Sequence, residues 1–217
     1  MYRLKPYRKP ALIVGLIAIG MALGFYSARY YDQTGAEQRI EGFFWPNPKQ
    51  IYPFVTVDHH GNTFNLDRLE GKWSFIFFGY THCPDICPVT LTVLSRVYNR
   101  LTQLEPDAKI QVLFVTADPE RDNPEQLEQY VTYFNKHFIG LGGTPAQVQS
   151  LAVQLGAVAT TEAVGVNGDY QVEHSALVFL TDPRARLVTV YATPHDAVSI
   201  EKRFLKIKNF MDGRIQS

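Results

Sequence analysis

Short apolar runs alternate with helical patterns along the chain from Phe54 onward. The run Trp73–Phe78 (WSFIFF) is almost continuously apolar, which predicts a strand buried on both faces of a sheet. Further apolar runs predict strands at 110–116, 176–180 and 187–191. The pattern is therefore that of a domain with a buried central sheet.

Two hairpins are also expected from the alternation of apolar and turn residues. The segments Phe54–Asp58 and Asn62–Asn65 flank the polar turn His59-His60-Gly61. A second hairpin is expected over 164–172, where Asn167-Gly168 is a turn signal.

Four helices are predicted in the same region. The first follows residue 87 and ends near Pro106, with apolar residues at three- and four-residue spacing: Leu91, Leu94, Val97, Tyr98, Leu101 and Leu104. Asn123-Pro124 starts the second, which is expected to bury Leu127, Tyr130, Val131, Phe134 and Phe138. Thr144-Pro145-Ala146-Gln147 is a capping box opening a third helix that Gly156 can end, and Thr193-Pro194 starts a last one reaching about Met211.

Strands that alternate with helices, followed by an antiparallel pair and a final helix, describe an α/β sandwich. The order fits a thioredoxin-like sheet with hairpin insertions. Periodicity alone does not single out that fold.

The N-terminal part differs in character from the rest. Residues 10–28 carry no charge, and 19 helical residues span roughly 28 Å, close to the ~30 Å hydrocarbon core of a bilayer. We expect a single transmembrane anchor; a cleaved signal peptide is the main alternative, although Ser27-Ala28-Arg29 is a poor cleavage site. The expected organisation is a basic flank at 1–9, the anchor at 10–28, a tether at 29–50 and one thioredoxin-like domain at 51–212.

Charge is distributed unevenly although the formal net charge is zero. Four bases lie in the first nine residues, so the remainder carries 17 basic against 21 acidic residues and is mildly acidic. That balance gives no support to nucleic-acid binding. The basic flank is expected to stay in the cytoplasm, or in the matrix of a mitochondrion, so the domain would face the periplasm or the intermembrane space from the inner or cytoplasmic membrane.

The only two cysteines lie together in Cys83-Pro84-Asp85-Ile86-Cys87, where the buried strand gives way to a helix. Asp85 can cap that helix, although it could instead tune the site or contact a partner. The helix dipole is expected to lower the pKa of a thiol in the first turn. A structural disulfide is a weak alternative, because so short a loop gains little from closure.

The spacing of the cysteines favours metal chemistry over disulfide exchange. Thioredoxin-type enzymes use two intervening residues, whereas this motif has three, which leaves two thiolates about one helical turn apart. Two soft sulfurs suit Cu(I) but leave it short of ligands, so a third ligand such as an imidazole is expected.

The run Phe77–Pro88 (FFGYTHCPDICP) closely resembles the signature of the SCO/SenC family of copper-binding cytochrome oxidase assembly proteins. Two further blocks agree, at 118–122 (DPERD) and 170–175 (YQVEHS), so the resemblance extends from about Gly61 to Asp182. Glu173 departs from the aspartate usual in that family. The resemblance implies that Cys83, Cys87 and His174 hold copper as Cu(I), with Cu(II) left open.

It also implies a metallochaperone that receives copper from an upstream donor and passes it to the CuA centre of cytochrome c oxidase subunit II. The main alternative is a thiol–disulfide oxidoreductase that reduces the cysteines of that centre; a third is a thiol peroxidase, suggested by Thr81 and Cys83. The chain has no proline between Ala146 and Asp182, where thioredoxin-type reductases carry a cis-proline, which counts against general disulfide exchange.

The other histidines are expected to have ordinary roles. His59 and His60 lie in a polar turn and should be solvated, and His82 should point away from its neighbour Cys83. His137 and His195 are expected at a helix end and a helix start. Asp118 is either a turn residue or part of the site, since Asp-Pro is also a plain turn signal.

Overall fold

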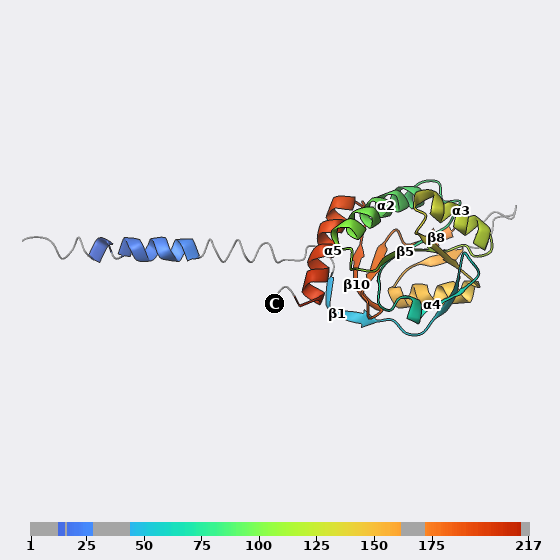
Figure 1. Ribbon diagram of the computed structural model, residues 1–217, viewed down its shortest axis with the longest axis horizontal. Coiled ribbons are helices and arrows are strands. Elements are labelled where there is room, and N and C mark those ends of the chain that lie inside the picture. Colours follow the sequence, from blue (N-terminus) through green and yellow to red (C-terminus); the bar gives the residue numbers. More distant parts are fainter. Residues whose placement is uncertain (1–12, 16, 28–43, 162–171, 214–217) are drawn as a thin grey trace, which may run out of the picture. The chain divides into compact units, whose positions relative to one another are not determined.

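The computed structural model describes residues 13–15, 17–27, 44–161 and 172–213. Residues 44–213 contain a sheet, a two-stranded ribbon and helices on both sides of the sheet (Figure 1). Their strands are β1 (Phe44–Gln50), β2 (Val55–Asp58), β3 (Thr63–Asn65), β4 (Trp73–Gly79), β5 (Ile110–Thr116), β6 (Ile139–Gly142), β7 (Ala159–Thr161), β8 (Val172–His174), β9 (Val178–Thr181) and β10 (Arg186–Tyr191). Their helices are α2 (Ile86–Leu104), α3 (Pro124–Phe134), α4 (Pro145–Leu155) and α5 (Ala197–Met211), with a short 3-10 turn at Leu66–Arg68.

The main sheet has eight strands in the order β1-β10-β9-β4-β5-β6-β2-β3. Strands β4, β5 and β6 are parallel, whereas β9 runs antiparallel to β4. The start of β9 therefore lies beside the end of β4, with Val178 opposite Phe77. This register brings the segment before β9 to the carboxyl end of β4.

Strand β4 is buried at all seven positions, as its apolar run predicts. Phe78 and Ile76 belong to the core cluster that contains the apolar residues of α4. Phe75 packs instead against Phe204 of α5, with ring centroids 5.7 Å apart. Successive side chains thus support two layers of helices, and α4 lies on the opposite side of the sheet from α2 in Figure 1.

The predicted hairpin at β2 and β3 and the strands β4, β5, β9 and β10 are confirmed within a residue or two at their ends. So is the capping box of α4: the Thr144 side chain accepts from Gln147 N, and Gly156 ends the helix with φ 71°. The predicted turn Asn167-Gly168 lies outside the described residues.

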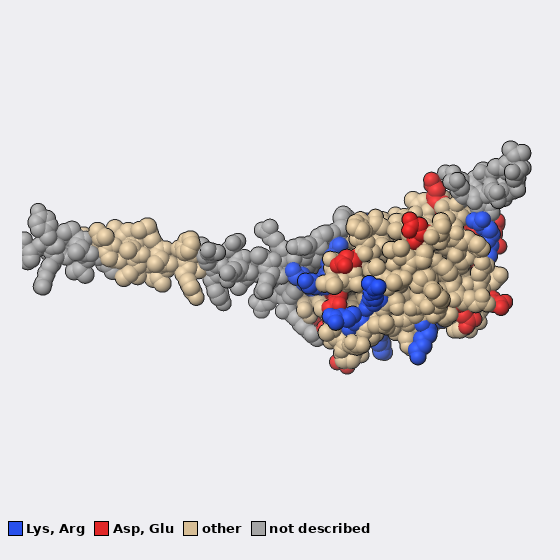
Figure 2. All heavy atoms as spheres, turned by 90° about the horizontal axis from the view of Figure 1, so that it is seen from above, with Lys and Arg blue, Asp and Glu red and all other residues tan. Residues whose placement is uncertain are grey.

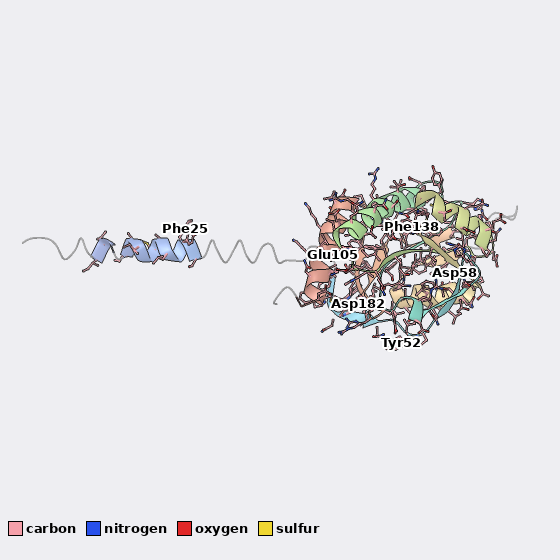
Figure 3. The ribbon with its side chains drawn as sticks, viewed as in Figure 1. Phe25, Tyr52, Asp58, Glu105, Phe138 and Asp182 are labelled. Atoms are coloured by element: carbon pink, nitrogen blue, oxygen red, sulfur yellow. The ribbon has the colours of Figure 1, made fainter. Side chains whose placement is uncertain are left out.

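Three elements differ from the expectation. Residues Phe44–Gln50, assigned to the tether, form β1 at the edge of the sheet. Its two prolines lie where the register with β10 is irregular, and proline is tolerated at such places on an edge strand. Strand β6 was not expected, because two of its four residues are glycine. Phe138, which was expected to be buried by the second helix, follows the end of α3 and is buried beneath α2 and α3 (Figure 3). The last helix begins at Ala197, not Thr193, because Asp196 caps it by accepting from Ser199 N at 2.8 Å.

The N-terminal helix is described by itself. Residues 13–15 and 17–27 are helical, and their large apolar side chains are exposed. Within the part of the chain that the structure describes, no helix is both long enough and apolar enough to cross a membrane.

Basic and acidic side chains lie among one another on the face of the domain drawn in Figure 2.

Candidate metal centre

Three elements carry the predicted ligands. Cys83 lies in the irregular turn between β4 and α2, Cys87 in the first turn of α2, and His174 at the end of β8. Strand β8 pairs only with β7 among the described strands, with His174 opposite Ala159. The segment after His174 leads into β9, so the histidine reaches the carboxyl end of β4 through the antiparallel β4–β9 pairing.

The structure brings the three side chains together. The Nε2 atom of His174 lies 3.7 Å from the Sγ of Cys87 and 3.9 Å from the Sγ of Cys83. All three ligand atoms lie within 4.8 Å of one another, and both cysteines are free thiols. Among the described residues, no other set of three or more His, Cys, Asp or Glu side chains gathers in this way.

The orientation of His174 suits a metal ligand. Its Nδ1 lies 3.4 Å from the carbonyl oxygen of Ser175, which can only accept a hydrogen bond. The ring proton therefore belongs on Nδ1, which leaves the lone pair of Nε2 directed at the sulfurs. The rings of Phe77 and Tyr80 meet the imidazole edge-on, with centroids 6.1 and 5.7 Å away.

The wall behind Cys87 is formed by a glycine and an aromatic ring. A Cβ atom on Gly79 would lie 2.6 Å from the Cys87 sulfur and 2.7 Å from the ring of Phe114. Only glycine allows the end of β4 to approach the thiol this closely. Cys87 is fully buried, whereas Cys83 is 9% exposed and His174 is half-buried.

Burial dominates the electrostatics of the metal-free site. It raises the pKa of the Cys87 thiol well above its usual value, although the backbone N–H of Tyr80 acts in the opposite direction. The expectation that the helix dipole would lower the pKa of that thiol is thus wrong for the metal-free protein, because desolvation of a thiolate outweighs the dipole. Burial likewise lowers the pKa of His174, which keeps the imidazole neutral and able to ligate.

The residues around the motif have mixed outcomes. Asp85 occupies the cap position of α2, but its side chain makes no capping hydrogen bond. Asp118 is fully buried and forms an ion pair with Arg121. His82 is exposed, contacts Thr81 and Gln126, and has its Nδ1 3.8 Å from a carboxylate oxygen of Asp122; it is not among the grouped ligand atoms.

The expectation that His59 is solvated is wrong. Only 7% of its surface is exposed, and its Nδ1 accepts a hydrogen bond from Gly140 N at 2.9 Å. The hairpin turn folds against β6, which the sequence did not indicate as a strand, and this covers the ring. His60 is exposed, His137 stacks on Tyr98, and His195 lies 3.1 Å from the carbonyl oxygen of Ala176.

Sequence reasoning assigned no role to three residues that shape the site, namely Gly79, Tyr80 and Asp122, although they lie in the blocks that carry the resemblance. Glycine directly after an apolar strand and just before the cysteine motif was a usable signal for the first. The place of Asp122 follows only from the pairing of β4 with β5.

Comparison with known proteins agrees with this geometry. Residues 46–211 match the SCO1/SenC family. The chain belongs to that family. A Stutzerimonas stutzeri protein whose name refers to copper binding is 39% identical over 184 residues, which is 85% of this chain and 86% of that protein. Mitochondrial SCO2 of Saccharomyces cerevisiae is 37% identical over 148 residues, or 68% of this chain, and the match spans only 49% of the yeast protein.

The fold is also shared with solved members of the family. The crystal structure of yeast Sco1 with copper bound superposes with a TM-score of 0.68 at 31% identity, covering 78% of this chain and 96% of that one. The α/β thioredoxin-like fold predicted from the sequence is thereby confirmed. Copper is the metal in that relative, and the Cys83, Cys87 and His174 group is consistent with a copper site.

Proposed function

We propose that this protein is a copper metallochaperone for the CuA centre of cytochrome c oxidase, with Cys83, Cys87 and His174 as the copper ligands. The observation that carries the proposal is the convergence of two thiols and one imidazole nitrogen within 4.8 Å. Two thiolates and a neutral imidazole form a soft donor set that suits Cu(I). Membership of the SCO1/SenC family supports copper as the cargo.

The unequal exposure of the ligands suits delivery by ligand exchange. Cys87 is closed off by Gly79 and Phe114, whereas Cys83 and His174 reach the surface. A thiol or imidazole of an acceptor can therefore approach copper from the side of Cys83 while Cys87 still holds it. The acceptor is oxidase subunit II, and an upstream donor protein supplies the metal.

The proposed location follows from the N-terminal segment. Residues 10–28 anchor the protein in the inner or cytoplasmic membrane, and a tether holds the domain on the periplasmic or intermembrane-space side. The uncharged stretch and its basic flank support this arrangement.

A second function is favoured by one observation: the two cysteines are free thiols lying close together. Their oxidation to a disulfide needs only a small movement, so the protein could act as a thiol–disulfide oxidoreductase on the cysteines of subunit II. The imidazole beside them has no evident part in that chemistry.

His174→Ala separates the two functions. We expect it to lower Cu(I) affinity sharply and to abolish CuA loading, while Cys83 and Cys87 still form a reversible disulfide. His137→Ala is the matched control, because it removes an exposed imidazole that stacks on Tyr98 of α2 and belongs to no proposed ligand group. Copper retention against a chelator, the dithiol potential and CuA loading are measured in each variant. Wild-type copper affinity and loading in His174→Ala would exclude the site, and lost copper with persistent oxidase assembly would favour the oxidoreductase.

A further inference from the structure

Cys83 differs from the other two proposed ligands in how the chain holds it. Cys87 is fixed by helix α2 and His174 by strand β8. Cys83 lies in an irregular turn, where its backbone N–H donates to the carbonyl of Tyr80 at 3.2 Å. The position of its sulfur therefore depends on whatever anchors residues 80–83.

The anchor is a buried carboxylate from the next loop. Asp122 follows β5 and is only 3% exposed. It accepts from the backbone N–H of Thr81 at 3.0 Å and from the Thr81 hydroxyl at 2.6 Å. It also accepts from the hydroxyl of Thr116, at the end of β5, at 2.6 Å. One carboxylate thus ties the turn before Cys83 to the end of the neighbouring strand.

The two loops are joined at a second point, since Ala117 N donates to the carbonyl of Gly79 at 2.6 Å. That bond extends the pairing of β4 with β5 by one step beyond Gly79. The contacts of Asp122 begin where this pairing ends. They hold Thr81 in place beyond the last backbone hydrogen bond between the two strands.

A carboxylate is the group that these contacts require. Thr81 N–H can only donate, and each threonine hydroxyl can donate as well, so three donors converge on two oxygens. Charge-assisted hydrogen bonds of this kind are about twice as strong as neutral ones. An asparagine of the same shape would place an N–H₂ group where an acceptor is needed.

We infer that Asp122 is a positioning residue for the metal site, which holds the Thr81–Cys83 turn so that the Cys83 sulfur faces Cys87 and His174. The inference rests on the proposed function and gives a role to the second sequence block, 118–122, that copper ligation alone leaves unexplained. Outer-shell partners of this type typically change metal affinity by about 10–100-fold when lost.

The test uses four variants of the full chain. Asp122→Asn removes one acceptor, Thr81→Val removes one hydroxyl while keeping the shape, and Thr81→Ser restores the hydroxyl. Asp182→Asn is the matched control: it too is a buried carboxylate that accepts backbone N–H groups, from Arg184 and Arg186. It follows Thr181, which pairs with Ser74 near the start of β4, whereas Gly79 is the last residue of that strand.

Three quantities are measured: Cu(I) affinity by competition with a chelator, amide hydrogen exchange of Thr81 and Cys83 in the reduced metal-free protein, and melting temperature. We expect Asp122→Asn and Thr81→Val to weaken Cu(I) binding about tenfold or more and to speed exchange at both amides. Thr81→Ser should restore both, and Asp182→Asn should lower the melting temperature alone.

Wild-type affinity and exchange in Asp122→Asn would overturn the inference, as would copper affinities that simply follow melting temperature across all four variants. Failure of the wild-type protein to bind Cu(I) would instead refute the proposed function. The exchange rates of the metal-free protein would still decide whether Asp122 orders the turn.

Discussion

Gly79 is the residue at which the backbone itself limits the size of the metal site. Gly79→Ala would place a methyl group 2.6 Å from the Cys87 sulfur, and neither β4 nor Phe114 can move aside easily because both are buried. Overpacking of this kind typically costs about 1–3 kcal/mol. We expect the variant to lose stability in urea and to bind Cu(I) more weakly, because the sulfur is displaced.

Gly142→Ala is the control for that prediction. Its added methyl would lie 3.3 Å from the tip of the Leu127 side chain, a milder contact than the 2.6 Å at Gly79, and it touches no proposed ligand. Copper affinity should stay at the wild-type level. Equal loss of copper binding in both variants would show that Gly79 acts only through general stability.

His59 makes the stability of the domain sensitive to acid. Burial lowers its pKa, and the nearby charge of His60 acts in the same direction, whereas Glu128 and Asp58 oppose it. His59 therefore binds a proton more readily in the unfolded chain than in the folded protein. The contribution of the neutral ring to the free energy of unfolding is complete above the unfolded pKa of about 6.5 and is lost as the pH falls towards the lower folded pKa.

His59→Asn should reduce that loss, because the asparagine oxygen can accept from Gly140 N without titrating. We expect urea unfolding between about pH 7.5 and 5.5 to show a smaller fall in stability for the variant than for the wild type. Burial also lowers the pKa of His174 and of His195, but both residues are common to the two proteins and cancel in the comparison. Identical pH profiles would contradict the prediction.

Helix α4 is the element whose ends the sequence specified best. Thr144 and Gln147 form the reciprocal cap, and Gly156 takes the left-handed conformation. Thr144→Ala should cost about 1 kcal/mol of stability and leave Cu(I) affinity unchanged, since α4 carries no proposed ligand. Thr144→Ser keeps the capping oxygen and should unfold like the wild type; a copper defect in Thr144→Ala would mean that α4 contributes to the site.

Elements with a strong local signal were predictable, and those defined by distant partners were not. The apolar run of β4 predicts a strand by itself, but β6 has the sequence Ile-Gly-Leu-Gly and is defined by its pairing with β5 and β2. Helix α3 packs closely upon it. A Cβ on Gly140 would lie only 3.0 Å from the Cβ of Leu127. The small residues that weaken the strand signal are the ones that this packing requires.

The candidate site divides in the same way. The cysteine pair and its place between a strand and a helix are local features, so residue patterns alone pointed to them. His174 lies 87 positions beyond Cys87, and only the family resemblance singled it out. Its position depends on the antiparallel pairing of β9 with β4, which no local pattern encodes.

The membrane topology of the whole molecule can be tested directly. If residues 10–28 are an anchor with its basic flank inside, a reporter that works only outside the cytoplasm should be active when fused after Ser217. Replacing Arg3, Lys5, Arg8 and Lys9 with glutamine should weaken this orientation. Activity of a cytoplasmic reporter at the same position would contradict the proposed location.

The spacing of the ligands also bears on the stability of the whole domain. Cys83 and His174 are separated by 91 positions, so an ion bound to both would act as a cross-link across more than a third of the chain. A disulfide between Cys83 and Cys87 would close a loop of only a few residues, and closure entropy grows with loop length. A bound copper ion would thus stabilise the fold much more than a disulfide between the same two sulfurs. Delivery of the copper would remove the long-range cross-link and leave the protein in a more easily unfolded form.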